Sequence, residues 1–481
     1  MAVLSGVEPQ DVMFYFEEIC KIPHGSGNTE KIADYIENFA REKGLEYNRD
    51  EMNNVVVVKA AAKGREAAES VIVHGHIDMV CEKAPHIDKN MELEGLDLEI
   101  CGDEIYAKGT TLGADDAIAV SMMLALLAAE DISHPRLEAV FTSDEEIGML
   151  GAAALNTDML KGKVLINIDS EDEGVFTVGC AGGNRTSCTL PVVREDFCTG
   201  EGIKLSIGGL KGGHSGVDIN RGRANANVLM GRLLYAIEKE CPIRICSLEG
   251  GLKDNVIPQE ARAVIAAQSV EKVREICGKM QKRFADEYSK SEDGIKISCE
   301  AHKPSEQPMN ERSTRNSVFM LMCMPCGVTK MSLELKGEVE SSLNMGIVKS
   351  EKDFLKIVFC VRSSLEEDKR LMTEKIEHFA KMLGGKTEVH GDYPGWEFKP
   401  NSKLLNAMKK VFYEQYGYEP KIETIHAGVE CGIFQSKING LDCISLGPMI
   451  KDIHTYRERM SVNSVCRVWK MLKKFLNDFD R

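Results

Sequence analysis

The sequence lacks any long apolar run. No window of about 18 uninterrupted apolar residues occurs in the 481 residues, so we expect no membrane span. The opening residues MAVLSGVEPQDVMFYFEEI contain no basic stretch leading into an apolar one, so we expect no signal peptide. An excess of positive charge is also missing, because the formal net charge is −15. This balance argues against nucleic acid and anionic membranes as partners.

A regular cysteine pattern is absent as well. The 16 cysteines are scattered without a repeating interval, which disfavours a disulfide framework. The CxxC pair Cys323 and Cys326 has no second pair nearby, and a structural zinc site needs four ligands. We therefore interpret the cysteines as reduced thiols and expect a cytoplasmic protein.

The order of predicted elements indicates an interrupted domain. The first third alternates apolar strands, such as VIVHGH, with helices such as DDAIAVSMMLALLAAE. This rhythm predicts an α/β fold with a mostly parallel sheet and flanking helices. Longer strands and amphipathic helices follow, and the last ninety residues return to the first pattern. We predict a catalytic domain at 1–185 and 391–481, interrupted by an inserted domain at 186–390.

The inserted segment contains a weak internal repeat. An apolar strand, a serine and a charged helix follow one another from Ala261, and the same order recurs from Leu355. A duplicated α+β unit explains this repeat best, although short strand–turn–helix units also resemble one another by chance.

Polar residues interrupt the apolar strand VIVHGHID. His74, His76 and Asp78 are two positions apart, which places them on one face of an extended chain. A single buried histidine is usually satisfied by the backbone, but three aligned polar groups would each carry a desolvation cost if unpaired. A bound metal offsets this cost, and Asp78 could accept the spare ring N–H of His76.

Carboxylates follow the other predicted strands and open the long helix. Asp115 and Asp116 precede the helix, the run Asp144 to Glu146 follows one strand, and Asp169 follows another. Each taken alone also fits a helix cap, a solvated loop or an Asx turn. Together they should meet at one edge of the sheet, where α/β folds bind ligands. Imidazole and carboxylate ligands suit Zn²⁺, Co²⁺ or Mn²⁺, and there are enough of them for two ions.

Six motifs occur in a familiar order: HGHIDMV, GADDAIA, SDEEIGMLGA, NIDSEDEG, GGHSGVDI and HAGVECG. The sequence thereby resembles the di-zinc metallopeptidases of the aminoacylase and carboxypeptidase-G type over nearly its whole length. The resemblance implies a zinc-exopeptidase-like catalytic domain with an inserted lid domain. In simpler relatives the lid is single and pairs across a dimer, whereas here it is doubled.

The resemblance also implies a role for each residue of the metal site. His76 and Asp169 would bind one divalent ion, and Glu146 and His454 the other. Asp115 would bridge the two ions. The peptide bond between Asp115 and Asp116 would be cis. Asp78 would orient His76, and Glu145 would be the general base. Zn²⁺ is the expected metal, with Co²⁺ and Mn²⁺ as alternatives.

Substrate-binding residues are implied in the inserted domain. His214 in GGHSG would stabilise the oxyanion, and Asn255 and Arg362 match polar substrate-binding positions. An Arg fork suits a free carboxylate, although a surface salt bridge is the ordinary interpretation of Arg362. His74, His426 and Glu430 remain candidates for orienting a ligand or binding the substrate amine.

The expected activity is metal-dependent hydrolysis of dipeptides with free termini, including Xaa-His, through a metal-bridged water. The alternatives are an N-acyl amino acid deacylase on the same scaffold and a non-catalytic metal- or peptide-binding protein. The presence of Glu145 disfavours the last of these. Expected partners are small dipeptides, with a homodimer as an option.

Overall fold

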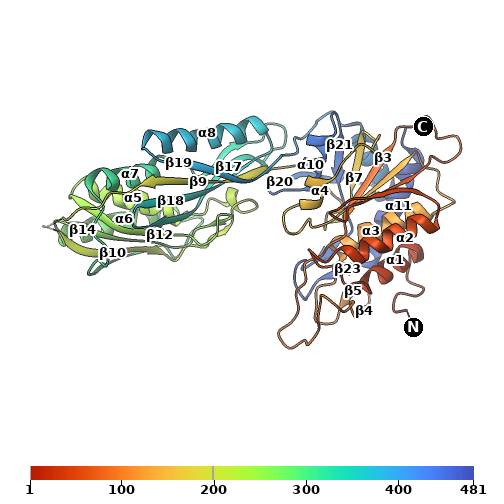
Figure 1. Ribbon diagram of the computed structural model, residues 1–481, viewed down its shortest axis with the longest axis horizontal. Coiled ribbons are helices and arrows are strands. Elements are labelled where there is room, and N and C mark those ends of the chain that lie inside the picture. The colour runs from red at the N-terminus through yellow and green to blue at the C-terminus, as the bar shows by residue number, and fades with distance from the viewer. Residues whose placement is uncertain (1, 198–199, 481) are drawn as a thin grey trace. The chain divides into compact units, whose positions relative to one another are not determined.

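The computed structural model describes residues 2–197 and 200–480. The chain forms two compact units (Figure 1). Unit 1 comprises Met1–Gly179, Trp396–Thr424 and Val429–Arg481, and unit 2 comprises Cys180–Gly395 and Ile425–Gly428. In Figure 1 the red N-terminal and blue C-terminal segments both belong to unit 1, so its fold joins the two ends of the sequence.

Unit 1 is built on an eight-stranded sheet in the order β1-β2-β6-β3-β7-β21-β8-β20. Its centre is parallel, because β3 pairs in parallel with β6 and β7, and β7 with β21. The pairs β1–β2, β2–β6 and β21–β8 are antiparallel. The strands are β1 (Glu46–Arg49), β2 (Val55–Lys59), β3 (Val71–His76), β6 (Leu137–Thr142), β7 (Val164–Asn167), β8 (Val175–Cys180), β20 (Lys421–Ile425) and β21 (Asp442–Ser445). The expected α/β architecture is confirmed, with the parallel pairing at the centre of the sheet.

The central strands are apolar because helices cover them. All residues of β3, β6 and β7 are buried, as is usual for parallel strands covered on both faces. Helix α3 is buried around most of its circumference and packs on β3. A Cβ at Gly75 would lie 2.6 Å from Ala119 Cβ, so glycine permits this close approach. The helices of unit 1 are α1 (Gln10–Cys20), α2 (Glu30–Glu42), α3 (Ala114–Ala128), α4 (Leu150–Ala154), α9 (Lys403–Tyr416), α10 (Glu430–Lys437) and α11 (Val462–Asp478).

A second, four-stranded sheet in unit 1 has the order β22-β23-β5-β4. It joins an early segment of the sequence to the C-terminal one, since Met460 pairs with Ile105. The strands are β4 (Leu98–Cys101), β5 (Glu104–Ala107), β22 (Ile450–Lys451) and β23 (Arg459–Ser461).

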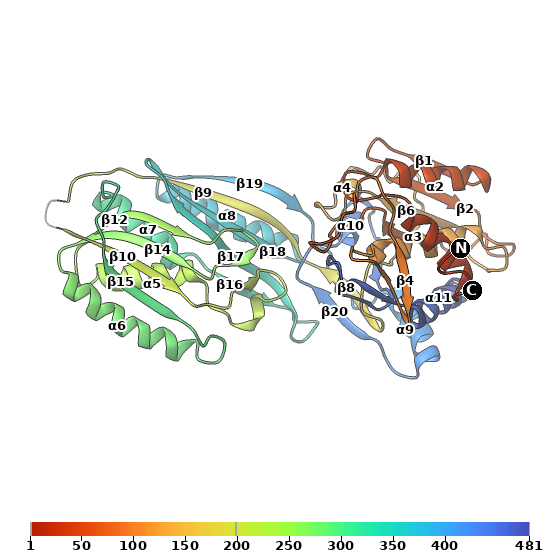
Figure 2. The ribbon, with the colours of Figure 1, turned by 90° about the horizontal axis from the view of Figure 1, so that it is seen from below.

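Unit 2 contains a nine-stranded sheet in the order β15-β10-β14-β12-β17-β18-β9-β19, with β16 paired to β17. Figure 2 shows these strands side by side, with β19 at one edge. The strands are β9 (Gly182–Pro191), β10 (Glu201–Gly208), β12 (Ile243–Gly250), β14 (Ala261–Ala267), β15 (Lys296–Ala301), β16 (Gly327–Met331), β17 (Val339–Ser350), β18 (Phe354–Ser363) and β19 (Lys386–Tyr393). A separate pair consists of β11 (Gly213–His214) and β13 (Val256–Ile257).

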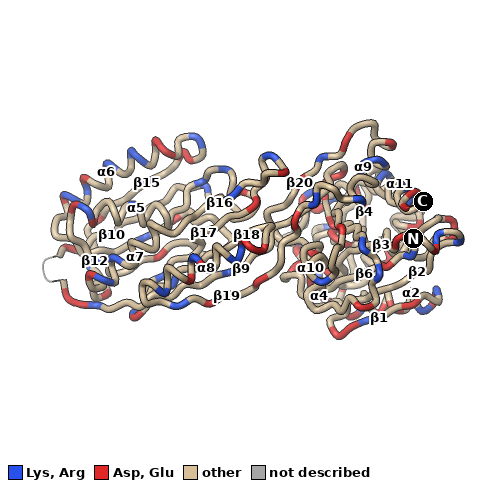
Figure 3. The backbone as a smooth tube through the Cα atoms, turned by 90° about the horizontal axis from the view of Figure 1, so that it is seen from above, with Lys and Arg blue, Asp and Glu red and all other residues tan. Residues whose placement is uncertain are grey.

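Four helices and one short 3₁₀ turn complete unit 2. They are α5 (Ala226–Glu238), α6 (Val270–Glu287), α7 (Glu311–Cys323), α8 (Glu366–Met382) and η1 (Ile219–Arg221). The two sequence repeats are β14 followed by α6 and β18 followed by α8. Charges of both signs alternate along α6 and α8 (Figure 3), whereas their apolar residues enter one core with the sheet.

Two further expectations, on membrane spans and on the cysteines, can be compared with the residues that the structure describes. None of their helices is both long and apolar enough to cross a membrane. Their cysteines are free thiols.

Candidate active site

Two histidines from opposite ends of the sequence lie on one carboxylate in unit 1. His76, the last residue of β3, places Nε2 3.1 Å from Asp115 Oδ1. His454, in the loop between β22 and β23, places Nε2 3.1 Å from Asp115 Oδ2. The two oxygens of Asp115 therefore face two different imidazoles.

A second carboxylate accompanies each histidine. Asp169 Oδ1 lies 3.5 Å from His76 Nε2, and Glu146 Oε1 lies 2.8 Å from His454 Nε2. The result is two groups of one imidazole and one carboxylate, which share Asp115. Both sets offer the nitrogen and oxygen donors that zinc-like ions prefer.

The potential ligand atoms are close enough for metal binding. Three groups each have ligand atoms within 4.8 Å of one another. They are Asp115, Glu146 and His454; His76, Glu145 and Glu146; and His76, Asp116 and Asp169. The arrangement fits a pair of divalent ions, because two cations would balance several crowded carboxylates.

The backbone adopts special conformations at these residues. The peptide bond between Asp115 and Asp116 is cis, as the resemblance implied. Asp144 and His454 have positive φ angles of 54° and 58°. Residues other than glycine seldom adopt this conformation, and such residues cluster at functional sites.

Asp78 connects the histidine to the loop that carries Glu145. Its Oδ1 lies 3.5 Å from His76 Nδ1, but the nearer acceptor for that nitrogen, at 3.0 Å, is the Asp78 main-chain carbonyl. The Asp78 carboxylate also accepts hydrogen bonds from the backbone N–H groups of Glu145 and Glu146. Ser26 Oγ donates a further bond to Asp78 Oδ2 at 2.7 Å. Asp78 lies beyond the end of β3 and positions two segments of the site at once.

The site is strongly acidic. Burial alone would lower the pKa of His76, but hydrogen bonds with Asp115, Asp169 and Asp78 raise it well above its ordinary value. Hydrogen bonds with Asp115 and Glu146 raise the pKa of His454 to about 10. These shifts have one cause: the surrounding carboxylates favour positive charge at this place, which a bound cation would also supply.

Burial has the opposite effect on the neighbouring acids. It is the main cause that raises the pKa of Glu145 well above its ordinary value, and the charges of Asp169, Glu430 and Glu146 add to it. Burial and Asp169 likewise raise the pKa of Asp116, whose Oδ2 accepts the His76 backbone N–H at 3.1 Å. A carboxyl group with a raised pKa next to potential metal ligands is suited to accept and return a proton.

Glu458 holds the segment that leads into Asp115. Its Oε2 accepts hydrogen bonds from the N–H groups of Leu112 and Gly113 at 2.7 and 2.9 Å. Its Oε1 accepts those of Ala114 and Asp115 at 2.8 and 3.4 Å. The side chain is 2% exposed, so this carboxylate replaces water for four consecutive N–H groups.

His74 belongs to a separate buried network. Its Nδ1 lies 2.8 Å from Asn167 Oδ1, and its Nε2 lies 3.0 Å from Thr142 Oγ1 and 3.1 Å from Glu430 Oε2. Thr142 Oγ1 also donates to Glu430 at 2.7 Å. These bonds join three neighbouring strands to helix α10, so His74 and Glu430 link the sheet to this helix next to the site.

In unit 2, the hydrogen bonds of His214 indicate which ring nitrogen carries the proton. The backbone N–H groups of Gly216 and Val217 donate to His214 Nδ1 at 3.2 and 3.4 Å. Nδ1 is therefore an acceptor, and in the neutral ring the proton lies on Nε2. Burial, followed by the charge of Arg362, lowers the pKa of His214, which favours this neutral donor form.

Arg362 and His426 lie in the same part of unit 2. Arg362 is 7% exposed and donates to the Tyr393 hydroxyl at 3.0 Å, while its Nε has no hydrogen-bond partner among the described residues. His426 Nε2 lies 2.7 Å from the hydroxyl of Ser342, which is paired with Arg362 across β17 and β18. Burial and Arg362 lower the pKa of His426 to about 3. A buried guanidinium with an unused donor is suited to bind a carboxylate.

Comparison with known proteins agrees with this geometry. A family model described as "Peptidase family M20/M25/M40" matches residues 72–478 of the chain. The chain belongs to this peptidase family. It is 35% identical to the cytosol non-specific dipeptidase of Escherichia coli (strain K12), over 99% of both chains. It is a hydrolase that acts on peptide bonds, and M20 peptidases are metal-dependent.

Solved structures show the same fold. The aminoacylhistidine dipeptidase of Vibrio alginolyticus matches with a TM-score of 0.95 and 34% identity, over 99% of this chain and 98% of that chain. An M20 family metallo-carboxypeptidase from Sulfolobus solfataricus matches with a TM-score of 0.52 and 15% identity, over 98% and 99%. The second match concerns the fold alone.

The fold of this chain brings the predicted metal ligands together in unit 1. They are His76, Asp115, Glu146, Asp169 and His454. Asn255 lies beside His214 in unit 2, because its carbonyl accepts the Ser215 N–H at 2.8 Å. Sequence reasoning missed Glu458, Ser26 and Tyr393. Glu458 lies four positions after His454 and Ser26 follows the sequence Pro-His-Gly, but neither position by itself predicts a contact with the site.

Proposed function

We propose that this protein is a dinuclear metallo-dipeptidase that hydrolyses dipeptides with free termini, Xaa-His among them, in the cytoplasm. The observation that carries the proposal is the position of Asp115 between two imidazole–carboxylate pairs, with Glu145 next to one of the ligands. The two similar proteins, a cytosol non-specific dipeptidase and an aminoacylhistidine dipeptidase, support the substrate class and the compartment.

The proposed ligands divide into two sets. His76 and Asp169 would hold one ion, Glu146 and His454 the other, and Asp115 both. Zn²⁺ is the proposed metal, because mixed nitrogen and oxygen ligands suit it. When bound, two such ions lower the pKa of a water molecule and polarise the substrate carbonyl.

Glu145 is the proposed general base. It would accept a proton from the attacking water and return it to the amine that leaves when the peptide bond breaks. Burial raises the pKa of Glu145, which would help it to keep the proton until the amine leaves. Asp78 holds the Glu145 backbone N–H, so Asp78 would keep the base in position while it also orients His76.

Unit 2 supplies the other proposed groups. The Nε2–H of His214 would donate to the developing oxyanion. Arg362 would bind the free C-terminal carboxylate, and Asn255 would add a polar contact to the substrate. The unused Nε of Arg362 supports its role, because a buried donor without a partner is unfavourable until a ligand accepts its hydrogen bond.

The test is hydrolysis by the chelated and the metal-restored protein. The panel should contain Gly-His, Met-His, carnosine, cysteinylglycine, a tripeptide and an N-acetyl amino acid. We expect restored activity on dipeptides with free termini. Hydrolysis of acetylated amino acids but not dipeptides would favour a deacylase and contradict the proposal.

Glu145→Gln tests the role of the base. We expect metal binding to remain and turnover to fall by at least about 10²-fold, the lower range for general acid–base catalysis. The matched control is Glu51→Gln, which changes an exposed glutamate in a turn and should leave turnover unchanged. Full activity of Glu145→Gln would disprove the assignment.

A further inference from the structure

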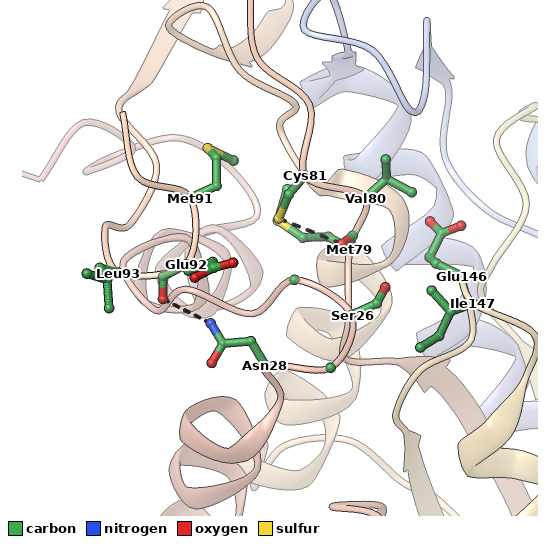
Figure 4. A pocket seen from close by; sticks show the side chains of 12 residues that line it. Ser26, Asn28, Met79, Val80, Cys81, Met91, Glu92, Leu93, Glu146 and Ile147 are labelled. Atoms are coloured by element: carbon green, nitrogen blue, oxygen red, sulfur yellow. Dashed lines mark hydrogen bonds between the residues drawn. The ribbon is translucent and has the colours of Figure 1, made fainter. Parts of the chain in front are cut away.

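The loop that carries Glu145 and Glu146 packs only partly into unit 1. It runs from Ser143, directly after β6, to Gly151 in α4, and we call it the Glu145 loop. Ile147, in its middle, is 56% exposed. Glu146 and Ile147 line a cavity of about 660 Å³ (Figure 4), so one side of the loop faces open space. The position of the two glutamates therefore depends strongly on hydrogen bonds that hold the rest of the loop.

Asn54 joins the two ends of the Glu145 loop. It directly precedes β2 and is 1% exposed. Its Oδ1 accepts the Ser143 backbone N–H at 3.0 Å, and its Nδ2 donates to the Gly151 carbonyl at 3.0 Å. The Gly151 N–H also donates to the Ser143 carbonyl at 3.0 Å. One buried amide therefore closes the loop at its base, across 89 and 97 positions of sequence.

The amide of Asn54 is itself held in one orientation. The Asp50 carboxylate accepts the Asn54 backbone N–H at 3.0 Å on Oδ1 and a bond from Asn54 Nδ2 at 2.7 Å on Oδ2. Asn54 Oδ1 also accepts the Ser143 hydroxyl at 3.4 Å. Both donors and both acceptor positions of the side chain are thus in use. The position needs an amide, because a carboxylate has no N–H for Gly151 or Asp50.

Gly151 shows how closely the two ends of the loop approach each other. A Cβ at this position would lie 2.3 Å from the Ser143 carbonyl oxygen and 2.4 Å from Asn54 Oδ1. Such distances are too short for non-bonded atoms, so only glycine allows the backbone to approach this closely. A side chain at position 151 would force the loop away from Asn54.

We propose that Asn54 is a positioning residue for catalysis, because it clamps the ends of the Glu145 loop and thereby keeps Glu145 beside the metal ligands. This inference rests on the proposed function, in which Glu145 is the general base. Asn54 acts at the ends of the loop, whereas Asp78 holds the N–H groups of Glu145 and Glu146 in its middle. A displacement of a catalytic group by about 1 Å can lower the rate about 10²-fold, so loss of the clamp should be visible in kcat.

Two substitutions disturb the clamp from opposite sides. Asn54→Asp removes the donor to the Gly151 carbonyl and adds a charge beside Asp50. Gly151→Ala forces Ser143 and Asn54 apart without a change of charge. With Gly-His as substrate and saturating Zn²⁺, we expect each variant to lower kcat about 10–100-fold per folded molecule and to change KM by less than about threefold.

Each substitution has a matched control. Gly278→Ala adds a Cβ to helix α6, where nothing lies within 4 Å of it. Glu138→Gln weakens buried hydrogen bonds to the N–H groups of Lys161 and Gly162, at the opposite end of β6 from the loop. Both controls should keep the wild-type kcat per folded molecule, measured after the folded fraction has been determined by circular dichroism.

A double-mutant cycle with Glu145→Gln separates positioning from a general loss of structure. If Asn54 acts through Glu145, Asn54→Asp should lower the residual kcat of Glu145→Gln by less than about threefold. Gly151→Ala is tested in the same background, and it carries the test alone if Asn54→Asp does not fold. An equal fold-loss of kcat with and without Glu145, or a rise in KM alone, would overturn the proposal.

The outcomes also separate this inference from the proposed function. A wild-type protein that cleaves no dipeptide would contradict the proposed function itself. A wild-type protein that cleaves dipeptides, together with folded variants that keep full kcat, would contradict only the role of Asn54.

Discussion

Replacement of Glu458 by glutamine should weaken metal binding, although Glu458 is not a proposed ligand. The carboxylate accepts four backbone N–H groups, two on each oxygen, along the segment Leu112–Asp115. An amide has only one oxygen, so its NH₂ group would face two N–H donors with no acceptor between them. Hydrogen bonds to charged groups contribute about 1.5–3 kcal/mol each. The loss of two bonds should therefore destabilise unit 1 by about 3 kcal/mol or more.

The consequence for the metal site follows from the position of Asp115. Its backbone N–H is one of the four held by Glu458, and its carboxylate lies between His76 and His454. Loss of the support should displace the shared carboxylate from both sets of ligands. Residues that support ligands typically change metal affinity about 10–100-fold, so we expect a decrease of that size in Glu458→Gln.

Glu138→Gln is the matched control. Glu138 is also fully buried and accepts the backbone N–H groups of Lys161 and Gly162, but its contacts are made away from Asp115. Both variants should lower the midpoint of thermal unfolding, by about 2–4 °C per kcal/mol. Only Glu458→Gln should weaken binding in a competition titration against a fluorescent zinc chelator. Equal metal affinities in the two variants would refute the reasoning.

Three further predictions concern the metal, the substrate carboxylate and pH. Chelation should lower the unfolding temperature, because the crowded carboxylates lose their counterions. Added Zn²⁺ at about 100 times its Kd should restore about 2.7 kcal/mol of unfolding free energy. In a thermal shift assay, Asp115→Asn should abolish this gain. Arg362→Met should raise KM for Gly-His at least about tenfold but leave Gly-His amide unaffected, and an equal change for both would contradict carboxylate binding. The folded pKa of His426 is about 3, below the unfolded value of about 6.5, so its contribution to stability is complete above pH 6.5 and is lost as pH falls from there towards 3. The loss approaches about 1.4 kcal/mol per pH unit, and urea unfolding of His426→Asn should show a shallower decline than the wild type between pH 6.5 and 5.

The sequence alone indicated much of the fold, because the signals are local. The apolar runs that became β3, β6 and β7 end in His76, Thr142 and Asn167, and the first acidic residue follows two positions later in each case. Parallel neighbours bring these ends to one edge of the sheet. Proximity in sequence to a strand end was therefore sufficient to select His76, Glu145, Glu146 and Asp169 as candidates.

Other features depended on the tertiary structure. His74 and His76 have the same strand periodicity, yet only His76 reaches the acidic cluster, because Glu430 arrives from helix α10 to pair with His74. No local pattern shows that Glu458 will meet residues 112–115, more than 340 positions earlier in the sequence. Sequence reasoning from strand ends and motifs therefore selected the groups that meet in the candidate site. Packing between distant segments decided which groups are held in place and which are buried in support, because contacts across such separations leave no periodic signal along the chain.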